Sequence, residues 1–394
     1  MAGPLAGIRV LDFSVMISGP LAAMMLADLG ADVIKVETPG FGDVMRYLGS
    51  SRGGVSGLFI NTNRGKRSIA IDVKSAAGRQ AVDRLVRSAD VLIQNFRPGA
   101  ADRMGIGSSA MRSINPKLIY VSISGFGDTG PYAFKRVYDN VVQGYSGMAS
   151  VQTNNVTGEA ALLRNLVCDK VTGYTVTQSV TAALFARERG AGGQHIDVAM
   201  LDSAISFLWP DGAMDAALLE SDTNRTPTIG ANYRPMPVAN GAIAVSLVTD
   251  SEFAGMFRAI GLADLADDPK FSTALGRAQN STELIRHVLT GLAEMTVKDA
   301  IAQLDAHDVP CAPLLGLDEL PNDPQVIHND VFHEVEHPAA GRMRQVRPAA
   351  VFHTTVADPA RLAPSLGEHT HEVLDELGFT ADEIASMRSL GTIS

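Results

Sequence analysis

Short apolar runs alternate with amphipathic segments over the first two hundred residues of the chain. The runs rich in Val and Ile predict buried strands at Ile8–Phe13, Asp32–Glu37, Ser68–Asp72, Asp90–Gln94, Leu118–Ser122 and His195–Met200. Segments with apolar residues at helical spacing predict helices at Gly19–Leu29, Gly78–Ser88, Asp169–Arg187 and Leu201–Trp209. Strands that alternate with helices are typical of a mostly parallel sheet with both faces covered, so we expect an α/β fold.

A change in composition after residue 220 predicts a break between domains. Residues 221–237 are polar and rich in proline, which is typical of a linker. A second α/β segment follows, with a strand at Ala242–Leu247 and helices at Glu252–Ile260, Glu283–Leu292 and Val297–His307. The segment Asp323–Pro364 predicts a return of the chain, and closing helices are expected at Leu366–Leu377 and Ala381–Met387.

Composition and charge exclude several classes of protein. The 394 residues carry 33 basic and 43 acidic side chains, a net charge of −10, which argues against a nucleic acid or an anionic membrane as the main partner. Two cysteines, Cys168 and Cys311, cannot form a disulfide scaffold or a four-thiolate zinc site. The sequence shows no secretory leader pattern and no run of eighteen apolar residues, so a reducing cytoplasm is the expected setting.

Three strings match known motifs without the context that their chemistry needs. GFGDTG at 125–130 matches the dinucleotide pattern, but Pro131 follows it and no acidic residue ends a second strand about twenty residues later. HEVEH at 333–337 matches a zinc-binding pattern that requires a helix. Its alternating apolar residues predict a strand instead, where histidines four residues apart lie about 13 Å apart. GSSRG at 49–53 lacks the flanking strand and helix of a nucleophile elbow.

Two features are candidates for chemistry. The segment Asn63–Lys74 reads NRGKRSIAIDVK, and its basic residues indicate either a solvated turn or a pocket for a phosphate-rich ligand. Asp169 follows an apolar run and begins a long apolar helix. It is interpreted either as a helix cap or as a desolvated carboxylate near a positive helix end, where it can act as a covalent nucleophile.

The chain resembles the class III CoA-transferases, the family of formyl-CoA transferase, carnitine CoA-transferase and the α-methylacyl-CoA racemases. The matching strings run in order from residue 5 to residue 378: LAGIRVLDFS, GPLAAMMLADLGADVIKVETPGFGD, GKRSIAIDVK, ADVLIQNFRPGAADRMG, NPKLIYVSISGFGDTGPY, VYDNVVQG, GQHIDVAML and LGEHTHEVLDELG. Each string alone is weakly specific, but together they cover nearly the whole chain.

This resemblance implies a Rossmann-like large domain over 1–220, completed by 345–394, and a small α/β domain over 238–322. Residues 221–237 and 323–344 would be linkers. Members of this family form interlocked homodimers, and their substrates are an acyl-CoA donor and a carboxylic acid acceptor. Coenzyme A thioester would thus be a substrate, with no permanently bound cofactor and no metal.

The resemblance also implies roles for individual residues. Asp169 matches the family's catalytic aspartate. Residues expected at the coenzyme A site are Met16, Ile71, Lys74, Asn95, Phe96, Arg103, Arg136 and Tyr138. Backbone N–H groups near Met16 or Gly144 are candidates for stabilising an oxyanion.

The expected activity is acyl-CoA:carboxylate CoA transfer through a covalent aspartyl intermediate. An α-methylacyl-CoA racemase is the alternative, but racemases of this family carry His-Asp where this chain has Tyr138 and Asp139. Formyl-CoA members carry a glycine-rich flap, and no such run occurs between Ala231 and Asp250. A non-catalytic acyl-CoA-binding protein and an NAD-dependent oxidoreductase are further alternatives. Retention of Asp169 opposes the former, and the missing fingerprint context opposes the latter.

Overall fold

The computed structural model describes residues 3–154, 157–226, 228–356 and 361–394. The chain divides into two compact units, the larger formed by residues up to Thr228 together with Asp330–Ser394, and the smaller by Ile229–Asn329. The smaller unit therefore begins within the expected linker 221–237 and extends beyond residue 322.

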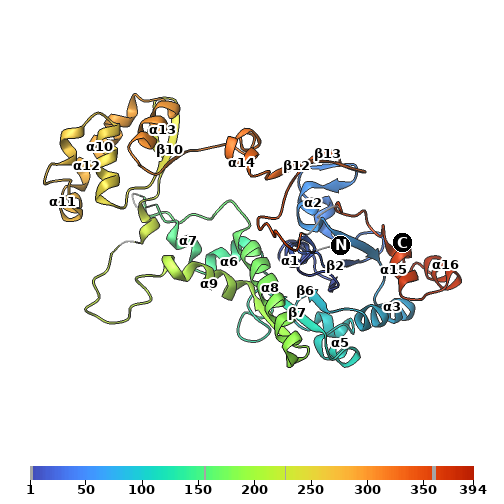
Figure 1. The fold of residues 1–394 in the computed structure, drawn as a ribbon. Helices are drawn as coiled ribbons and strands as arrows, with labels where there is room; N and C mark the ends of the chain where they lie inside the picture. The colour runs from blue at the N-terminus through green and yellow to red at the C-terminus, as the bar shows by residue number, and fades with distance from the viewer. Residues whose placement is uncertain (1–2, 155–156, 227, 357–360) are drawn as a thin grey trace. The chain divides into compact units, whose positions relative to one another are not determined.

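A six-stranded parallel sheet forms the centre of the larger unit (Figure 1). Its strands are β1 (Arg9–Asp12), β2 (Asp32–Glu37), β5 (Lys66–Ala70), β6 (Val91–Gln94), β7 (Ile119–Ser124) and β8 (His195–Ala199), in the order β5-β2-β1-β6-β7-β8. Each strand was expected from its apolar run, within two residues at either end. The order is that of a doubly wound fold, in which the sheet grows first to one side of β1 and then to the other.

Helices cover both faces of this sheet, as the alternating pattern predicts. One face packs against α1 (Ser18–Asp28) and α8 (Val167–Ala186), whose residues Ala22, Leu26, Val176 and Val180 are buried against the strands. The other face packs against α3 (Ala76–Arg87), α5 (Ser108–Ile114), α15 (Thr370–Glu376) and α16 (Ala381–Ser389) (Figure 1). The two apolar layers hold the carboxyl ends of the strands in fixed positions.

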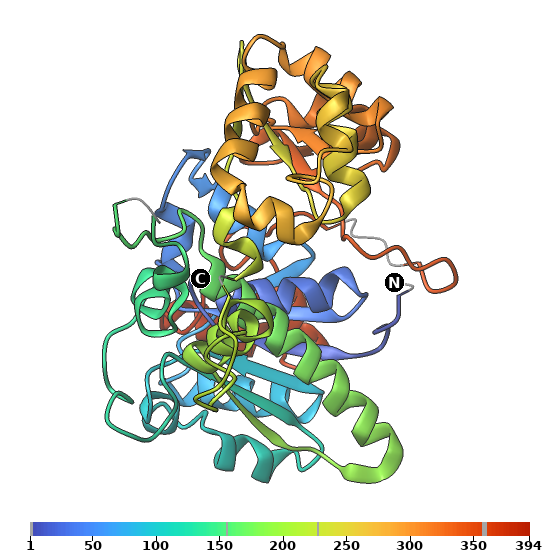
Figure 2. The same ribbon diagram turned by 90° about the vertical axis from the view of Figure 1, so that its left-hand side faces the viewer.

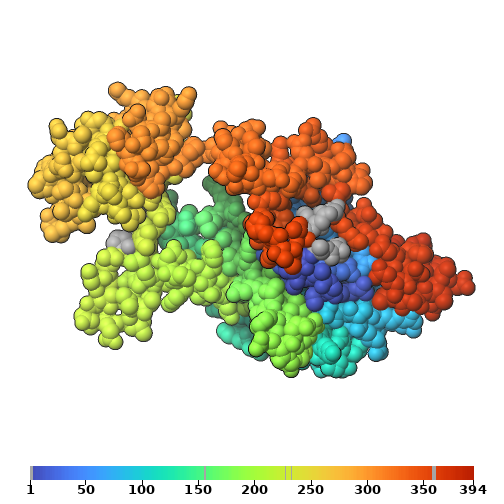
Figure 3. Space-filling model, in the orientation of Figure 1, coloured from blue at the N-terminus to red at the C-terminus, as the bar shows by residue number. Residues whose placement is uncertain are grey.

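The C-terminal helices are attached to the first hundred residues by buried and half-buried contacts. Arg67 of β5 forms ion pairs with Glu372 and Glu376 of α15, at 3.0 and 2.6 Å. Ile71 forms a bridge with Ile393. Figure 3 shows this C-terminal segment beside the surface of the N-terminal half. The last part of the chain thus completes the larger unit.

Shorter elements occupy the connections of the larger unit. They are β3 (Ser51–Arg52), β4 (Val55–Ser56), α2 (Gly57–Asn63), α4 (Ala100–Arg103), α6 (Asp139–Tyr145), α7 (Met148–Val151), α9 (Met200–Gly212), β12 (Phe332–His337) and β13 (Gly341–Val346). The pairing of β12 with β13 is antiparallel. The string HEVEH therefore lies in a strand, as its alternating pattern predicts.

The smaller unit has its own core (Figure 2). Its three-stranded antiparallel sheet has the order β11-β10-β9, formed by β9 (Met236–Val238), β10 (Gly241–Val245) and β11 (Cys311–Pro313). Helices α10 (Asp250–Ala259), α11 (Ala274–Gln279), α12 (Ser281–Ala293), α13 (Val297–Ala306) and α14 (Pro324–His328) complete it. Ile243, Met256, Leu292 and Leu304 are buried between sheet and helices.

Candidate active site

The strand order points to the carboxyl ends of β1 and β6 as the place for a ligand. In doubly wound sheets the ligand crevice opens where the direction of sheet growth reverses, and here that is between β1 and β6. Asn95 directly follows β6, and its side-chain amide bonds the backbone of Val15 twice. Its Oδ1 accepts from the Val15 N–H at 2.9 Å, and its Nδ2 donates to the Val15 carbonyl at 2.7 Å. The loop that connects β1 to α1 is therefore fastened to the end of β6.

A buried charge network holds the same loop from the other side. Met16 has a φ of 70°, a left-handed conformation that is uncommon for a residue other than glycine. Its N–H donates to the Asp43 carboxylate at 3.3 Å, and Asp43 forms an ion pair with Lys35 at 3.0 Å. Lys35 also donates to the carbonyl of Ser14 at 3.0 Å. These contacts define where α1 begins.

Asp169 lies against the first residue of α1. The Ser18 hydroxyl donates a hydrogen bond to Oδ1 of the Asp169 carboxylate. Asp169 is itself the third residue of α8, so its carboxylate lies between the N-terminal ends of two helices, where backbone dipoles favour negative charge. The sequence predicted a helix starting at Asp169. The structure begins that helix at Val167, with Leu166 at the N-cap and no side-chain cap from that residue.

Burial controls the ionisation of this carboxyl. Desolvation and, to a smaller extent, the nearby Asp139 carboxylate raise the pKa of Asp169 to about 6, against the opposite effect of the Ser18 hydrogen bonds. An apolar cluster under the site accounts for the desolvation. It contains Cys168, Val142, Met200 and Ala204, which are all buried. Asp169 is therefore a carboxyl group whose environment makes it more basic than usual.

The predicted coenzyme A residues occupy several parts of the larger unit. Met16 and Asn95 belong to the tied loop described above. Ile71 is buried in the apolar core that contacts Phe96, and Phe96 is half-buried at its edge. Next to Phe96 is a cavity of about 160 Å³, lined also by Arg97, Gly99, Tyr120 and Ser122. Four predicted residues are exposed: Lys74, Arg103, Arg136 and Tyr138.

Neither interpretation of the segment Asn63–Lys74, as a solvated turn or as a phosphate pocket, fits the buried Lys66 and Arg67. Lys66 is fully buried, with its ammonium 2.7 Å from Asp12. Arg67 binds Asp32 at 2.6 Å as well as the acidic residues of α15, and Arg64 binds Asp28 at 2.5 Å. Carboxylates distant in the sequence neutralise these charges. Within Asn63–Lys74, Lys74 alone presents an exposed basic side chain.

Backbone N–H groups near Met16 or Gly144 stay a prediction as oxyanion donors. The Met16 N–H is already bonded to Asp43. Gly144 is the sixth residue of α6, where backbone N–H groups bond within the helix. The start of α1 beside Ser18 is a better position, because the first N–H groups of a helix have no partner within it.

Sequence reasoning missed Ser18 and Asp139 as residues of the site. Ser18 stands in SGP, at the start of a helix that follows a strand. The N-terminal ends of such helices commonly bind anionic ligands. That context could have identified it. Asp139 is buried, and its Oδ2 accepts the Asp169 backbone N–H at 3.0 Å. Nothing in the sequence near Asp139 indicates this contact, which joins residues thirty positions apart.

Within the described ranges no group of three His, Cys, Asp or Glu side chains is arranged to hold a metal ion. His337 of HEVEH is buried, and its ring nitrogens bond the backbone of Ala339, Ala340 and Ala363. None of the helices in the described part of the chain is long and apolar enough to span a membrane.

The larger unit is thus a doubly wound α/β unit with a desolvated aspartate beside the start of α1. The model of CoA-transferase family III matches residues 5–370, and the chain belongs to that family. It is therefore a CoA-transferase acting on an acyl-CoA and a carboxylate. The resemblance to this family expected from the sequence is confirmed.

Named relatives agree with this assignment. The chain is 35% identical to succinate–glutarate CoA-transferase of Agrobacterium fabrum, over 95% of this chain and 96% of that protein. It is 32% identical to formyl-CoA:oxalate CoA-transferase of Escherichia coli, over 98% and 99% of the two chains. A CAIB/BAIF family protein from Brucella suis has a similar structure, with a TM-score of 0.83, 30% identity and coverage of 96% and 100%.

Proposed function

We propose that this enzyme transfers coenzyme A between an acyl-CoA and a carboxylate through a covalent intermediate on Asp169. The observation that carries the proposal is the Asp169 carboxylate, desolvated and held by Ser18 at the start of α1. A carboxylate with a raised pKa is a better nucleophile than an ordinary one, and at pH 7 to 8 it is still mostly ionised.

The reaction proceeds by four acyl transfers that balance without an oxidant or a metal. An Asp169 oxygen attacks the donor thioester carbonyl, and coenzyme A thiolate leaves, giving a mixed anhydride. The thiolate attacks the aspartyl carbonyl, which releases the donor acid and leaves an aspartyl thioester. The acceptor carboxylate then displaces the thiolate to form a second anhydride. Attack of the thiolate on the acceptor acyl carbon yields the new acyl-CoA and regenerates the Asp169 carboxylate.

We assign coenzyme A recognition to the predicted set of residues, Met16, Ile71, Lys74, Asn95, Phe96, Arg103, Arg136 and Tyr138. Phe96, half-buried at the edge of the core that contains Ile71, offers an apolar surface for the adenine ring. Exposed cations, such as Lys74 and Arg103, are suited to phosphate oxygens. The names of the two relatives mention glutarate and oxalate, and both favour a carboxylic acid as the acceptor.

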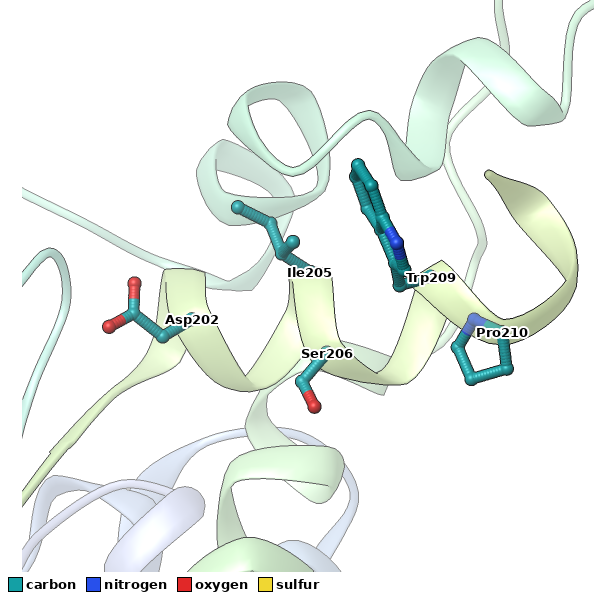
Figure 4. A pocket seen from close by; sticks show the side chains of 5 residues that line it. All are labelled: Asp202, Ile205, Ser206, Trp209 and Pro210. Carbon is teal, nitrogen blue, oxygen red and sulfur yellow. The ribbon is translucent and has the colours of Figure 1, made fainter. Parts of the chain in front are cut away.

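We further propose a homodimer, interlocked as in the family. Helix α9 exposes an apolar face, on which Ile205 and Trp209 project to the same side (Figure 4). The hollow along this face measures about 440 Å³. Trp209 on this face is 49% exposed, and large exposed apolar patches commonly mark protein interfaces. A 41.6 kDa species that persists in light scattering at all concentrations contradicts this assembly.

The covalent route is tested with the Asp169→Asn variant. The amide retains the shape of the carboxyl group but is a far poorer nucleophile, so transfer should fall below a few per cent of the wild-type rate. Incubation of the wild type with a panel of acyl-CoAs should give an adduct at Asp169 that hydroxylamine releases, detected by intact mass. Absence of the adduct with every donor contradicts the route. Rapid exchange of the α-proton of 2-methylacyl-CoA in heavy water, without transfer, would favour the racemase instead.

A further inference from the structure

The start of α8 lacks a cap from its own segment. Its N-cap residue, Leu166, has no side chain that can accept a hydrogen bond, although the first backbone N–H groups of a helix need partners from outside it. The N–H of Asp169, the third residue, finds its partner in the Asp139 carboxylate, the first residue of α6. The cap of this helix is therefore supplied by another helix, at the residue that carries the nucleophile.

Gln143, one turn further along α6, fixes this carboxylate. Its Nε2 donates to Oδ1 of Asp139 at 2.6 Å, while Oδ2 of Asp139 accepts the backbone N–H of Asp169. The same amide group holds the chain that leads into α8. Its Oε1 accepts the Leu163 N–H at 2.8 Å, and its Nε2 approaches the carbonyls of Leu163 and Asn165 at 3.2 and 3.3 Å. Asp139 and Gln143 are only 3% and 1% exposed, so solvent cannot replace these bonds.

We propose that Asp139, oriented by Gln143, is a positioning residue that fixes the backbone of Asp169 and faces its carboxylate with a second negative charge. Both carboxylate oxygens are used, Oδ2 by the Asp169 N–H and Oδ1 by Gln143 Nε2, so an asparagine could accept only one of these two bonds. The proposal rests on the proposed role of Asp169 as nucleophile.

The groups that act on Asp169 come from α1, α6 and α8. From α1 the facing group is Ser18, which donates hydrogen bonds to the carboxylate. From α6 it is Asp139, and on α8 itself the neighbouring side chain is the buried thiol of Cys168. The repulsion between the two carboxylates raises the pKa of Asp169, in the same direction as burial. A more basic carboxylate gains more when it forms a bond to an acyl carbon.

Two variants separate the cap from the charge. Asp139→Asn keeps an oxygen for the Asp169 N–H and removes the charge, whereas Asp139→Ala removes both. Gln143→Ala releases the chain at 163–165 and leaves the charge in place. Asp323→Asn is the matched control, because Asp323 caps α14 of the smaller unit with the same kind of bonds.

Two measurements that need no catalysis test the proposal. Hydrogen–deuterium exchange of the peptide 163–172 should rise at least tenfold in Asp139→Ala and Gln143→Ala. It should rise less in Asp139→Asn, which keeps one of the two acceptor oxygens, and should stay near the wild-type rate in the control. The Asp169 side chain is titrated by ¹³C NMR of labelled aspartate, and its signal is assigned with Asp169→Asn. The midpoint of this titration should move to lower pH in both Asp139 variants. Unchanged exchange in the alanine variants, or an unmoved titration in Asp139→Asn, overturns the proposal.

Kinetics add the functional consequence. Displacement of a reacting group by about 1 Å can cost about 100-fold in rate, so kcat of Asp139→Ala should fall by that order with little change in KM for acyl-CoA. In Asp139→Asn the acid limb of the rate profile should move to lower pH. If the wild type forms no adduct at Asp169, the covalent route fails, while exchange and titration still decide whether Asp139 holds and charges this position. A kcat in Asp139→Ala equal to that of the wild type overturns the positioning role.

Discussion

Gly173 of α8 lies directly against the carbonyl oxygen of Ser18. A Cβ atom at position 173 would come within 3.0 Å of that oxygen and 3.3 Å of the Leu21 side chain. Gly173 is one turn after Asp169, so this close approach of the two helices is what brings the Ser18 hydroxyl to the carboxylate.

A larger residue at position 173 should therefore impair catalysis. Gly173→Val would push the start of α1 away from α8, and we expect kcat to fall by about 10- to 100-fold, since small displacements of reacting groups are costly. Steady-state kinetics measures the loss. Gly57→Ala is the control, because a Cβ there meets only the Ser50 carbonyl at an ordinary 3.7 Å. Wild-type turnover in Gly173→Val would show that the approach of the helices does not position the site.

The rate of transfer should depend on pH with an acid limb near pH 6. The nucleophile is the ionised Asp169 carboxylate, and its pKa is raised to about 6. Below that pH the carboxyl is protonated and unreactive, so kcat/KM should fall about tenfold for each further unit, and it should level off above pH 7. A pH series with a fixed acyl-CoA donor measures this limb. A limb centred near pH 4 would mean that the carboxyl is solvated as in a free peptide.

Mutation of Lys66 should lower the stability of the fold, whereas mutation of Lys74 should weaken the binding of acyl-CoA. Lys66→Met removes the ammonium 2.7 Å from the buried Asp12 and leaves Lys35 at 3.8 Å, and breaking a buried ion pair costs about 3 kcal/mol or more of unfolding free energy. Lys74→Ala removes an exposed charge and should leave stability within about 0.5 kcal/mol, while KM for acyl-CoA rises. Urea unfolding and steady-state kinetics on both variants measure the contrast. An unchanged KM in Lys74→Ala would remove that residue from the proposed coenzyme A site.

The sequence predicted the strands of the parallel sheet well because each is a short apolar run between polar turns. The expected strand Asp32–Glu37 has the same bounds as β2. Short helices such as α6 were not predicted, since seven residues show too little periodicity to stand out from a loop.

In the candidate site, too, features that depend on neighbouring residues could be predicted, and contacts between distant residues could not. Asp169 could be named a candidate because its setting, an apolar run before a long helix, is visible locally, and its proposed role comes from the family resemblance. The burial of Lys66 and the contact of Asp139 with Asp169 depend on partners 54 and 30 positions away. A pattern along the chain does not contain such pairings, so the basic segment was interpreted as a solvated turn or a ligand pocket, and the burial of Lys66 was not expected.

Removal of the Asp169 charge should stabilise the fold while it abolishes transfer. The raised pKa means that folding disfavours the ionised carboxyl: between pH 3.8 and about 6 the folded state binds more protons than the unfolded state, so this group's contribution to stability falls as pH rises. Above pH 6 the full penalty applies, on the order of 3 kcal/mol for a shift of this size. Asp169→Asn retains an oxygen for Ser18 and lacks the charge. Its free energy of unfolding should therefore exceed that of the wild type by up to that amount at pH 8, and the difference should vanish near pH 4. Urea unfolding at both pH values measures it, with Asp375→Asn on the surface of α15 as the control. A variant that is less stable than the wild type at pH 8 would show that the fold favours the charged form.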